Sequence, residues 1–579
     1  MALRLSEFFA LAPLSRPALL DALKAGSTSS LTVLVACLLF GPQVGPVALF
    51  GSMLAQWEVG RPLIPRLLCA VIVGTVMTAT MALGVLVAPH RLLVIPVVVA
   101  VVMVMTMAYY SFQLSRGPGP LHLFYATAIG SYFGLFPAVA WPSVAVTAFS
   151  TAFTGFLTLL FLIPDRHRPE RRAVADAWSS VGAYSLATRN GTAPDALRML
   201  RHTAYAAVNR AWLTLQSATL GPFGRRGIAR FEAAAHDATR HLAELVTARI
   251  YPGVPLAARA TTARTLRGHP GFFFLLRHGF RPHSIAWFTA ARLGLAAAIA
   301  GIASDGLGLG HPYWSILTAT LVLHQWTDRL TTTLRALRRA VGTVLGLGVV
   351  LLVAWIDPDP WPMVAVIIGC IFGMCLLLPV NYAFAIVFVT PMALLSIEAT
   401  GHGGTIPDLL HDRLLETLLG VGIAILVVRV TGRQAEPRLV RTQIRRTIGA
   451  IHSVLAALAA ERTFAPDGLE ARAALQFELL TTTTVLTRAT ADISALSAWH
   501  PVELALIDLG YAAMSGCWID HPAATLSVGP ALAALDPLIH DPALIDGPRA
   551  DPDAIRALLE NARQALTNHP RGMIIQPVD

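Results

Sequence analysis

The chain has 579 residues, of which 55% are hydrophobic and only 13% are charged, whereas about a quarter of the residues in a soluble domain are charged. Its mean hydropathy is +0.60 and its formal charge is +10. These values exclude a soluble enzyme, a disordered protein and a fibrous repeat, and they indicate a chain that crosses a membrane many times. Arginine on cytoplasmic loops explains the positive charge of such a protein, so we expect no nucleic-acid partner.

Hydrophobic and polar residues alternate along the chain in long blocks. The first polar block holds 18 arginines against 7 acidic residues, and the second holds 12 arginines against 16 acidic residues. The blocks predict five parts in chain order. An N-terminal interfacial helix (1–26) is followed by a membrane bundle (27–164) and a helical cytoplasmic domain (165–283), and then by a second membrane bundle (284–430) and a second helical cytoplasmic domain (431–579).

Each apolar block is long enough for about six membrane-spanning helices, because about 20 residues cross the hydrocarbon core. In the first block we expect spans near 20–40, 44–57, 66–88, 91–110, 120–137 and 141–164. In the second block we expect them near 284–302, 311–325, 338–356, 361–378, 380–397 and 411–430. Six spans return the chain to its starting side. Both polar domains and both termini are therefore expected on one face, which the positive-inside rule makes cytoplasmic.

The two apolar blocks also share a pattern of polar and small residues. An offset of 268 aligns Gly74-Thr75 with Gly342-Thr343, Lys24 with Arg292, and Gln56 with His324. The pattern predicts a parallel repeat with a pseudo-twofold axis along the membrane normal. Substrate sites of transporters with repeats lie between the two halves.

The polar domains contain no sequence pattern of an enzyme. No Walker motif, cysteine pair or zinc-ligand spacing occurs, and the helical spacing of the apolar residues favours a scaffold or a pairing surface. We therefore expect no enzymatic activity, no metal and no cofactor.

One segment of the second apolar block resembles a known family. The run His311-Pro312-Tyr313-Trp314-Ser315-Ile316-Leu317-Thr318, followed by Arg335, Arg339 and Gly342-Thr343, resembles the signature of the fusaric acid resistance family, which is closely related to the aromatic acid exporters. The segments starting at Asn381-Tyr382 and Arg413-Leu414 resemble it too. The first half departs from the pattern, with Gly45-Pro46 in place of the Tyr-Trp pair. The resemblance implies a proton-driven inner-membrane exporter of aromatic or other organic acids, which in some cases works with a periplasmic adaptor.

Charged residues inside the apolar blocks are candidates for anion binding, since a central arginine or lysine costs roughly 2.5–3.5 kcal/mol on insertion scales. Arg292 could hold a carboxylate through paired N–H donors, and the alternative is that it reaches the inner headgroups. Lys24 is its counterpart in the first half. Arg335 and Arg339 could attract anions from the cytoplasm, or they could only orient the protein.

Aromatic and polar residues complete the predicted substrate site. Tyr313 and Trp314 begin an outer span, where they could stack on an aromatic substrate or form an interfacial belt. Asn381 and Tyr382 begin an inner span with the same two interpretations. The predicted substrate-binding residues are Arg292, Arg339, Arg335, Lys24, Tyr313, Trp314, Asn381, Tyr382 and Thr343.

Four further residues are candidates for proton coupling. His324 could relay a proton because histidine titrates near neutral pH, and Asp328 follows it on the same loop. Arg413 and Glu416 are three residues apart on one helix, so they could pair as a proton step or an outer gate. Ordinary structural roles are the alternative for all four.

The sequence thus predicts an all-α, multi-pass protein of the bacterial inner membrane that exports organic, chiefly aromatic, acids. Two other functions fit the same features: an organic-anion channel, and a membrane scaffold that recruits partners through its cytoplasmic domains. The expected partners are membrane lipids, the small organic anion, a second copy in a homodimer, and a periplasmic adaptor.

Overall fold

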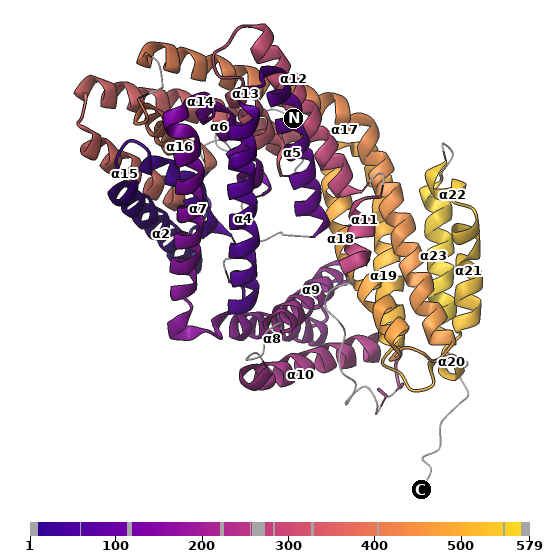
Figure 1. Cartoon of the computed structure of the whole chain (residues 1–579). Coiled ribbons are helices and arrows are strands. Elements are labelled where there is room, and N and C mark those ends of the chain that lie inside the picture. Colours follow the sequence, from indigo (N-terminus) through magenta and orange to yellow (C-terminus); the bar gives the residue numbers. More distant parts are fainter. Residues whose placement is uncertain are drawn as a thin grey trace. The chain divides into compact units, whose positions relative to one another are not determined.

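A computed structural model shows that the chain is helical (Figure 1). The structure describes residues 10–57, 60–112, 119–219, 225–254, 256–257, 272–281, 284–325, 329–401, 405–547 and 550–568. Within these residues eight helices are long and apolar enough to cross a membrane, and no strand is present beyond one bridge between Leu256 and Ile519. The predicted all-α multi-pass fold is confirmed.

The residues group into two compact units. The membrane unit comprises Met1–Asp165 and Leu275–Arg433, and the polar unit comprises Arg166–Phe274 and Gln434–Asp579. The helices α11 (Phe272–Gly279) and α17 (Ile406–Ala459) cross the boundary between the units.

The membrane unit is built from two runs of helices. The first run contains α2 (Arg16–Phe40), η1 (Gly45–Val47), α3 (Ala48–Ser52), η2 (Met53–Gln56), α4 (Leu63–Val87), α5 (Arg91–Ser111), α6 (Leu121–Phe133), α7 (Pro137–Leu160) and η3 (Ile163–Asp165). The second contains α12 (Ile285–Gly306), α13 (Pro312–Leu323), α14 (Arg329–Ile356), α15 (Pro360–Leu377), α16 (Tyr382–Glu398) and the start of α17.

Each predicted span overlaps one of these elements, with three differences in extent. The span expected at 44–57 is the short series η1, α3 and η2, because Gly45 and Pro46 do not support a regular helix. The helix α14 begins at Arg329, nine residues before its expected start, and α17 continues far beyond residue 430. Residues 16–26 belong to α2, whereas residues 1–9 of the expected interfacial helix lie outside the described residues.

Helix contacts follow the same order in both runs. We count η1, α3 and η2 together as the second span of the first run. The third span of each run then packs on the fifth, as α4 on α6 and α14 on α16. The first helix of each run packs on the fourth helix of the other, as α2 on α15 and α12 on α5. A twofold repeat would produce these reciprocal contacts, and the repeat itself stays a prediction.

Two glycines allow helices of the membrane unit to approach closely. A Cβ atom on Gly84 would lie 2.3 Å from the carbonyl oxygen of Thr127, across the contact of α4 with α6. A Cβ atom on Gly346 would lie 2.7 Å from the Cβ atom of Thr390, across the contact of α14 with α16. Small residues have this role in membrane helix pairs. They bring the backbones of α14 and α16 together beside the candidate site described below.

The polar unit is a separate group of amphipathic helices. Its first segment contains α8 (Arg168–Arg189), α9 (Pro194–Ala218) and α10 (Arg225–Ile250). Its second segment contains the end of α17, α18 (Pro466–Asp492), η5 (Ser494–Trp499), α19 (His500–Gly516), α20 (Pro522–Thr525), α21 (Val528–His540), α22 (Ala543–Asp546) and α23 (Pro552–Thr567). The helices α19, α23 and α21 lie side by side (Figure 1). The two segments are joined where the Tyr251 hydroxyl donates to the carbonyl of Ala512 at 3.0 Å.

Candidate functional site

A cavity of about 450 Å³ lies inside the membrane unit. Residues from both helix runs line it, from α3, η2, α4 and α6 in the first run and from α13, α14, α15, α16 and α17 in the second. Along α16 the lining extends from Tyr382 to Ile397, which is roughly 22 Å at 1.5 Å per residue. The cavity therefore follows most of the thickness of a hydrocarbon core, about 30 Å.

The two ends of the cavity differ in exposure. At one end, which we call the exposed end, Gln325, Thr331 and Leu378 are exposed. At the other, the buried end, Ile129, Trp314 and Ile397 are 4%, 1% and 2% exposed. In this structure the described residues thus leave the cavity accessible from one side of the membrane unit.

Arginine side chains dominate the polar part of the lining. Arg335, Arg338 and Arg339 come from α14. Arg338 and Arg339 follow Arg335 by three and four residues, which places all three on one face of the helix. Arg413 comes from the first turns of α17. Among the described lining residues none is aspartate or glutamate. The cavity is therefore a cationic environment with apolar walls, which favours an anion with an apolar body.

Arg339 is the most deeply buried of the three arginines on α14. Its residue is 2% exposed, and its Nε and Nη1 atoms have no hydrogen-bond partner among the described residues. The hydroxyl of Tyr382 lies close to the guanidinium. A buried charged donor without a partner is costly, so this guanidinium is available to bind an anion that enters the cavity.

Arg413 provides a second buried guanidinium near the buried end. It is 3% exposed, and its guanidinium carbon lies 4.9 Å from the centre of the Trp314 ring. Arg339 is near enough to interact with it electrostatically, and Tyr125 of α6 lies near both charges. Two like charges that are close enough to interact, with aromatic rings beside them, can share one bound anion.

Glu416 lies one turn from Arg413 on α17 and is fully buried. Its Oε1 atom accepts hydrogen bonds from the Ser304 hydroxyl at 3.2 Å and from the His311 backbone N–H at 3.0 Å. Its Oε2 atom has no partner among the described residues. Glu416 and Arg413 interact electrostatically without a direct ion pair within the described chain, which differs from the simple pair that their spacing suggested.

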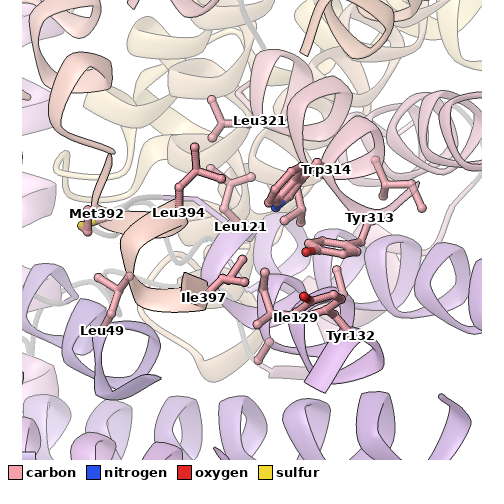
Figure 2. Packing of buried hydrophobic residues seen from close by; sticks show 14 of the residues in the cluster. Leu49, Leu121, Ile129, Tyr132, Tyr313, Trp314, Leu321, Met392, Leu394 and Ile397 are labelled. Atoms are coloured by element: carbon pink, nitrogen blue, oxygen red, sulfur yellow. The ribbon is translucent and has the colours of Figure 1, made fainter. Parts of the chain in front are cut away.

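Aromatic rings form a layer at the buried end, and Figure 2 shows Tyr132, Tyr313 and Trp314 close together there. The ring centres of Tyr132 and Tyr313 are 5.3 Å apart, those of Tyr313 and Trp314 are 5.4 Å apart, and those of His311 and Trp314 are 4.5 Å apart. Tyr313 is 5% exposed. Burial inside the protein separates both predicted aromatic residues from the lipid, so an interfacial belt does not describe them.

Histidine and glutamine side chains lie toward the exposed end of the cavity. His324 is 5% exposed, and its Nδ1 atom donates to the carbonyl of Leu321 at 2.6 Å. His122 of α6 also lines the cavity, and its Nδ1 atom accepts a hydrogen bond from Trp57 at 3.3 Å. Gln56, the residue aligned with His324 in the predicted repeat, is a lining residue as well. Both histidines therefore contribute to the polar part of the cavity lining.

The structure brings six of the predicted site residues to the cavity: Arg335, Arg339, Trp314, Tyr382, His324 and Arg413. Arg335 also donates to the Val322 carbonyl and to Gln325 at 3.3 and 2.7 Å, which ties α14 to the end of α13.

The other predicted residues that the structure describes do not line the cavity. Arg292 is 3% exposed on α12 and lies over the Phe288 ring at 5.4 Å. Lys24 lies over the Phe161 ring at 5.8 Å. Asn381 caps α16 by accepting a hydrogen bond from the Ala383 N–H at 2.8 Å. Tyr313 packs behind Trp314, Thr343 is buried in α14, Glu416 lies beside Arg413, and Asp328 is outside the described residues.

Sequence reasoning missed His122, Tyr125 and Gln56 as cavity residues. Their signal was present, because each is a polar residue in a predicted span and such residues mark pathways. All three residues belong to the first run, whereas the family-like segment lies in the second.

Comparison with known proteins agrees with this location. Residues 295–427 match the family described as fusaric acid resistance protein-like. The chain is 28% identical over 184 residues to the uncharacterized membrane protein YvaC of Bacillus subtilis (strain 168), which covers 30% of this chain and 28% of that protein. It is 30% identical over 152 residues to the inner membrane protein YccS of Escherichia coli (strain K12), which covers 26% of this chain and 20% of that protein.

These matches confirm the predicted family resemblance. The matched parts span less than a third of the length of either relative, and no solved structure matches the chain. Both relatives are named as membrane proteins, which agrees with the eight membrane-length helices.

Proposed function

We propose that this membrane protein, which is similar to the fusaric acid resistance protein-like family over residues 295–427, is an inner-membrane secondary exporter of aromatic carboxylates. The observation that carries the proposal is the cavity in the membrane unit. It combines two buried guanidiniums, Arg339 and Arg413, with a wall that includes Trp314, Tyr125 and Tyr382.

This lining matches an aromatic acid better than other solutes. A carboxylate would provide the acceptor that the Nε and Nη1 atoms of Arg339 and the Nε atom of Arg413 lack. Each hydrogen bond of this charged kind contributes about 1.5–3 kcal/mol. An aromatic ring would pack against Trp314 and Tyr125 and add the area-dependent burial term. A small inorganic anion would gain only the charge-assisted hydrogen bonds to the guanidiniums.

The proposed orientation places the exposed end of the cavity in the cytoplasm. Arg335 and Arg338 lie toward that end with Arg329 at the start of α14, and arginine is enriched on the cytoplasmic side of membrane proteins. The aromatic layer of Tyr132, Tyr313 and Trp314 then closes the outer side. On this view the structure corresponds to a conformation that loads its substrate from inside, and export requires the aromatic layer to separate.

Glu416 and His324 are the residues that we propose for proton coupling. Glu416 lies one turn from Arg413, so a change in its charge would alter the field that a bound anion experiences and would link proton binding to anion binding. His324 carries a proton on Nδ1, since the carbonyl of Leu321 can only accept, so a coupling proton would be taken by Nε2. The membrane potential provides a second driving force of about 2.3 kcal/mol per charge for each 100 mV.

The test is transport of 2-naphthoate by the purified chain in lipid vesicles. A pH gradient and a membrane potential are imposed separately, and the neutral 2-naphthamide is the comparison solute. Saturable naphthoate transport against its own gradient, without transport of the amide, would support the exporter. Flux that only dissipates the naphthoate gradient would identify an anion channel instead, and equal handling of acid and amide would contradict the role of the guanidiniums.

A further inference from the structure

The polar unit contains a second cavity, of about 260 Å³, that no part of the transport proposal uses. Residues of five helices line it, all within the polar unit: α8, α9 and α10 from the first segment, and α19 and α23 from the second. The lining residues that carry charge are Arg198, Arg201, Arg249, Arg563 and Asp508.

Positive charge exceeds negative charge in this cavity, with four guanidiniums against a single carboxylate among the described lining residues. Asp508 is shared by two of them, since its Oδ1 atom accepts from Arg201 at 2.6 Å and its Oδ2 atom accepts from Arg198 at 3.3 Å. Arg198 also pairs with Asp195, outside the lining. Arg249 and Arg563 form no ion pair with any described residue.

The excess of positive charge indicates a binding site because two of the arginines have buried donor atoms. Arg201 is 8% exposed, and its guanidinium lies 4.8 Å from the centre of the Tyr511 ring. Within the described part of the chain, the buried Nε atoms of Arg201 and Arg198 have no hydrogen-bond partner. Arginines on a solvated surface would leave these donors to water, whereas here two donors are enclosed beside a cavity. Buried donors of this kind normally have an acceptor.

The helix ends do not supply positive potential. The α9 helix contributes its N-terminal turn through Pro194 and Leu197, whereas α10 and α23 contribute their C-terminal turns through Ile250 and Thr567. One positive dipole end therefore faces two negative ends, which do not favour an anion. Recognition would therefore depend on the guanidiniums, whose planar N–H groups suit carboxylate and phosphate oxygens.

We propose that this arginine cavity binds a small multivalent oxyanion, either a phosphate ester or a polycarboxylate. The bound anion joins the first and second segments of the polar unit, because α9 and α10 contribute arginines from one segment and α23 contributes Arg563 from the other. The volume is below the range of about 300–1,000 Å³ typical of drug-sized ligands, so the ligand is a small metabolite rather than a dinucleotide. The site is independent of the transport cavity.

The experiment is calorimetric titration of the full chain in lipid nanodiscs with pyrophosphate, with citrate, and with acetate as the monovalent comparison. We expect saturable binding of pyrophosphate or citrate with one site per chain, and no comparable binding of acetate. Tighter binding of pyrophosphate assigns a phosphate ester, and tighter binding of citrate assigns a polycarboxylate. Equal binding of acetate, or no saturable binding of either multivalent anion, would overturn the proposal.

Two variants test whether the binding is at this cavity. Arg249→Gln and Arg563→Gln remove charges that form no ion pair with the residues the structure describes, so both variants should fold. Each should weaken binding about tenfold through the loss of a charge-assisted hydrogen bond. The matched control is Arg556→Gln on the same helix as Arg563, because Arg556 faces Asp553 and Glu560 instead of the cavity. Wild-type affinity in both cavity variants, or an equal loss in the control, would contradict the assignment.

Discussion

Replacement of Arg339 by glutamine tests the transport cavity most directly. Glutamine keeps a polar side chain of similar reach but removes the charge and the guanidinium donors. Two of those donors have no partner among the described residues, so a bound carboxylate would lose at least one charge-assisted hydrogen bond, which contributes about 1.5–3 kcal/mol. Because 1.4 kcal/mol corresponds to a factor of ten, we expect the Kd for 2-naphthoate to rise roughly 10- to 150-fold.

The same substitution should leave the protein folded. Arg339 and Arg413 repel each other in the empty cavity, so loss of one charge relieves repulsion and the thermal midpoint should not fall. Calorimetric titration of the detergent-solubilised chain with 2-naphthoate and 2-naphthamide provides the measurement. Arg91→Gln is the control, because Arg91 is an exposed arginine whose pair with Asp305 at 2.9 Å is a surface interaction that contributes about 0–1 kcal/mol.

An unchanged Kd for naphthoate in Arg339→Gln would refute the reasoning, as would an equal loss of amide binding. A fall in thermal midpoint without a change in affinity would show instead that the guanidinium serves the fold.

Three further predictions concern coupling, packing and pH. Glu416→Gln should tighten naphthoate binding and reduce its pH dependence, because a carboxylate one turn from Arg413 repels an anion bound there. Titrations across pH measure this. Gly346→Ala should lower the free energy of unfolding by about 1–3 kcal/mol through overpacking against Thr390. Gly348 has open space around it, so Gly348→Ala should leave the midpoint of thermal unfolding unchanged. Burial and the neighbouring Arg201 lower the pKa of His202. The polar unit should therefore lose stability as the pH falls below about 6.5, which is the pKa of histidine in an unfolded chain. His202→Gln should reduce this loss, as measured by denaturation at different pH values.

Each of these predictions has an opposing result. Weaker naphthoate binding by Glu416→Gln would show that the carboxyl group supports the site and does not oppose the anion. Equal midpoints for the two alanine variants would mean that α14 and α16 can separate without loss. The sign for His202 follows from linkage: its folded pKa is depressed, the unfolded chain binds the proton more tightly, and stability therefore rises with pH. Unchanged acid sensitivity in His202→Gln, with His540→Gln as the exposed control, would contradict that origin.

Much of the local structure could be predicted from the sequence. Membrane helices carry a strong signal, since each must present about 20 apolar residues to lipid. The ends were less certain: α14 begins nine residues before its predicted start because arginine and threonine in its first turns continue the helix without an apolar pattern. Arg335 and Arg339 therefore lie within the helix and not in a loop at its mouth.

The site was only partly predictable for a different reason. Arg292 and Arg339 are both arginines within predicted spans, yet of the two only Arg339 lines the cavity. The direction of a buried side chain depends on which helices pack around it, and that packing is a non-local property. His122 and Tyr125 reach the same cavity from α6 because α6 and α13 are neighbours in the membrane unit.

Composition, apolar run length and arginine placement were enough to identify a helical membrane protein with a cationic character and a family-like segment, because these features can be recognised along the chain without knowledge of its packing. Which charges share a cavity depends instead on how the helices pack against one another. Two guanidiniums that lie 74 residues apart in the chain, Arg339 and Arg413, converge on one space because α14 and α17 both border it, and such convergence leaves no periodic signal in the sequence.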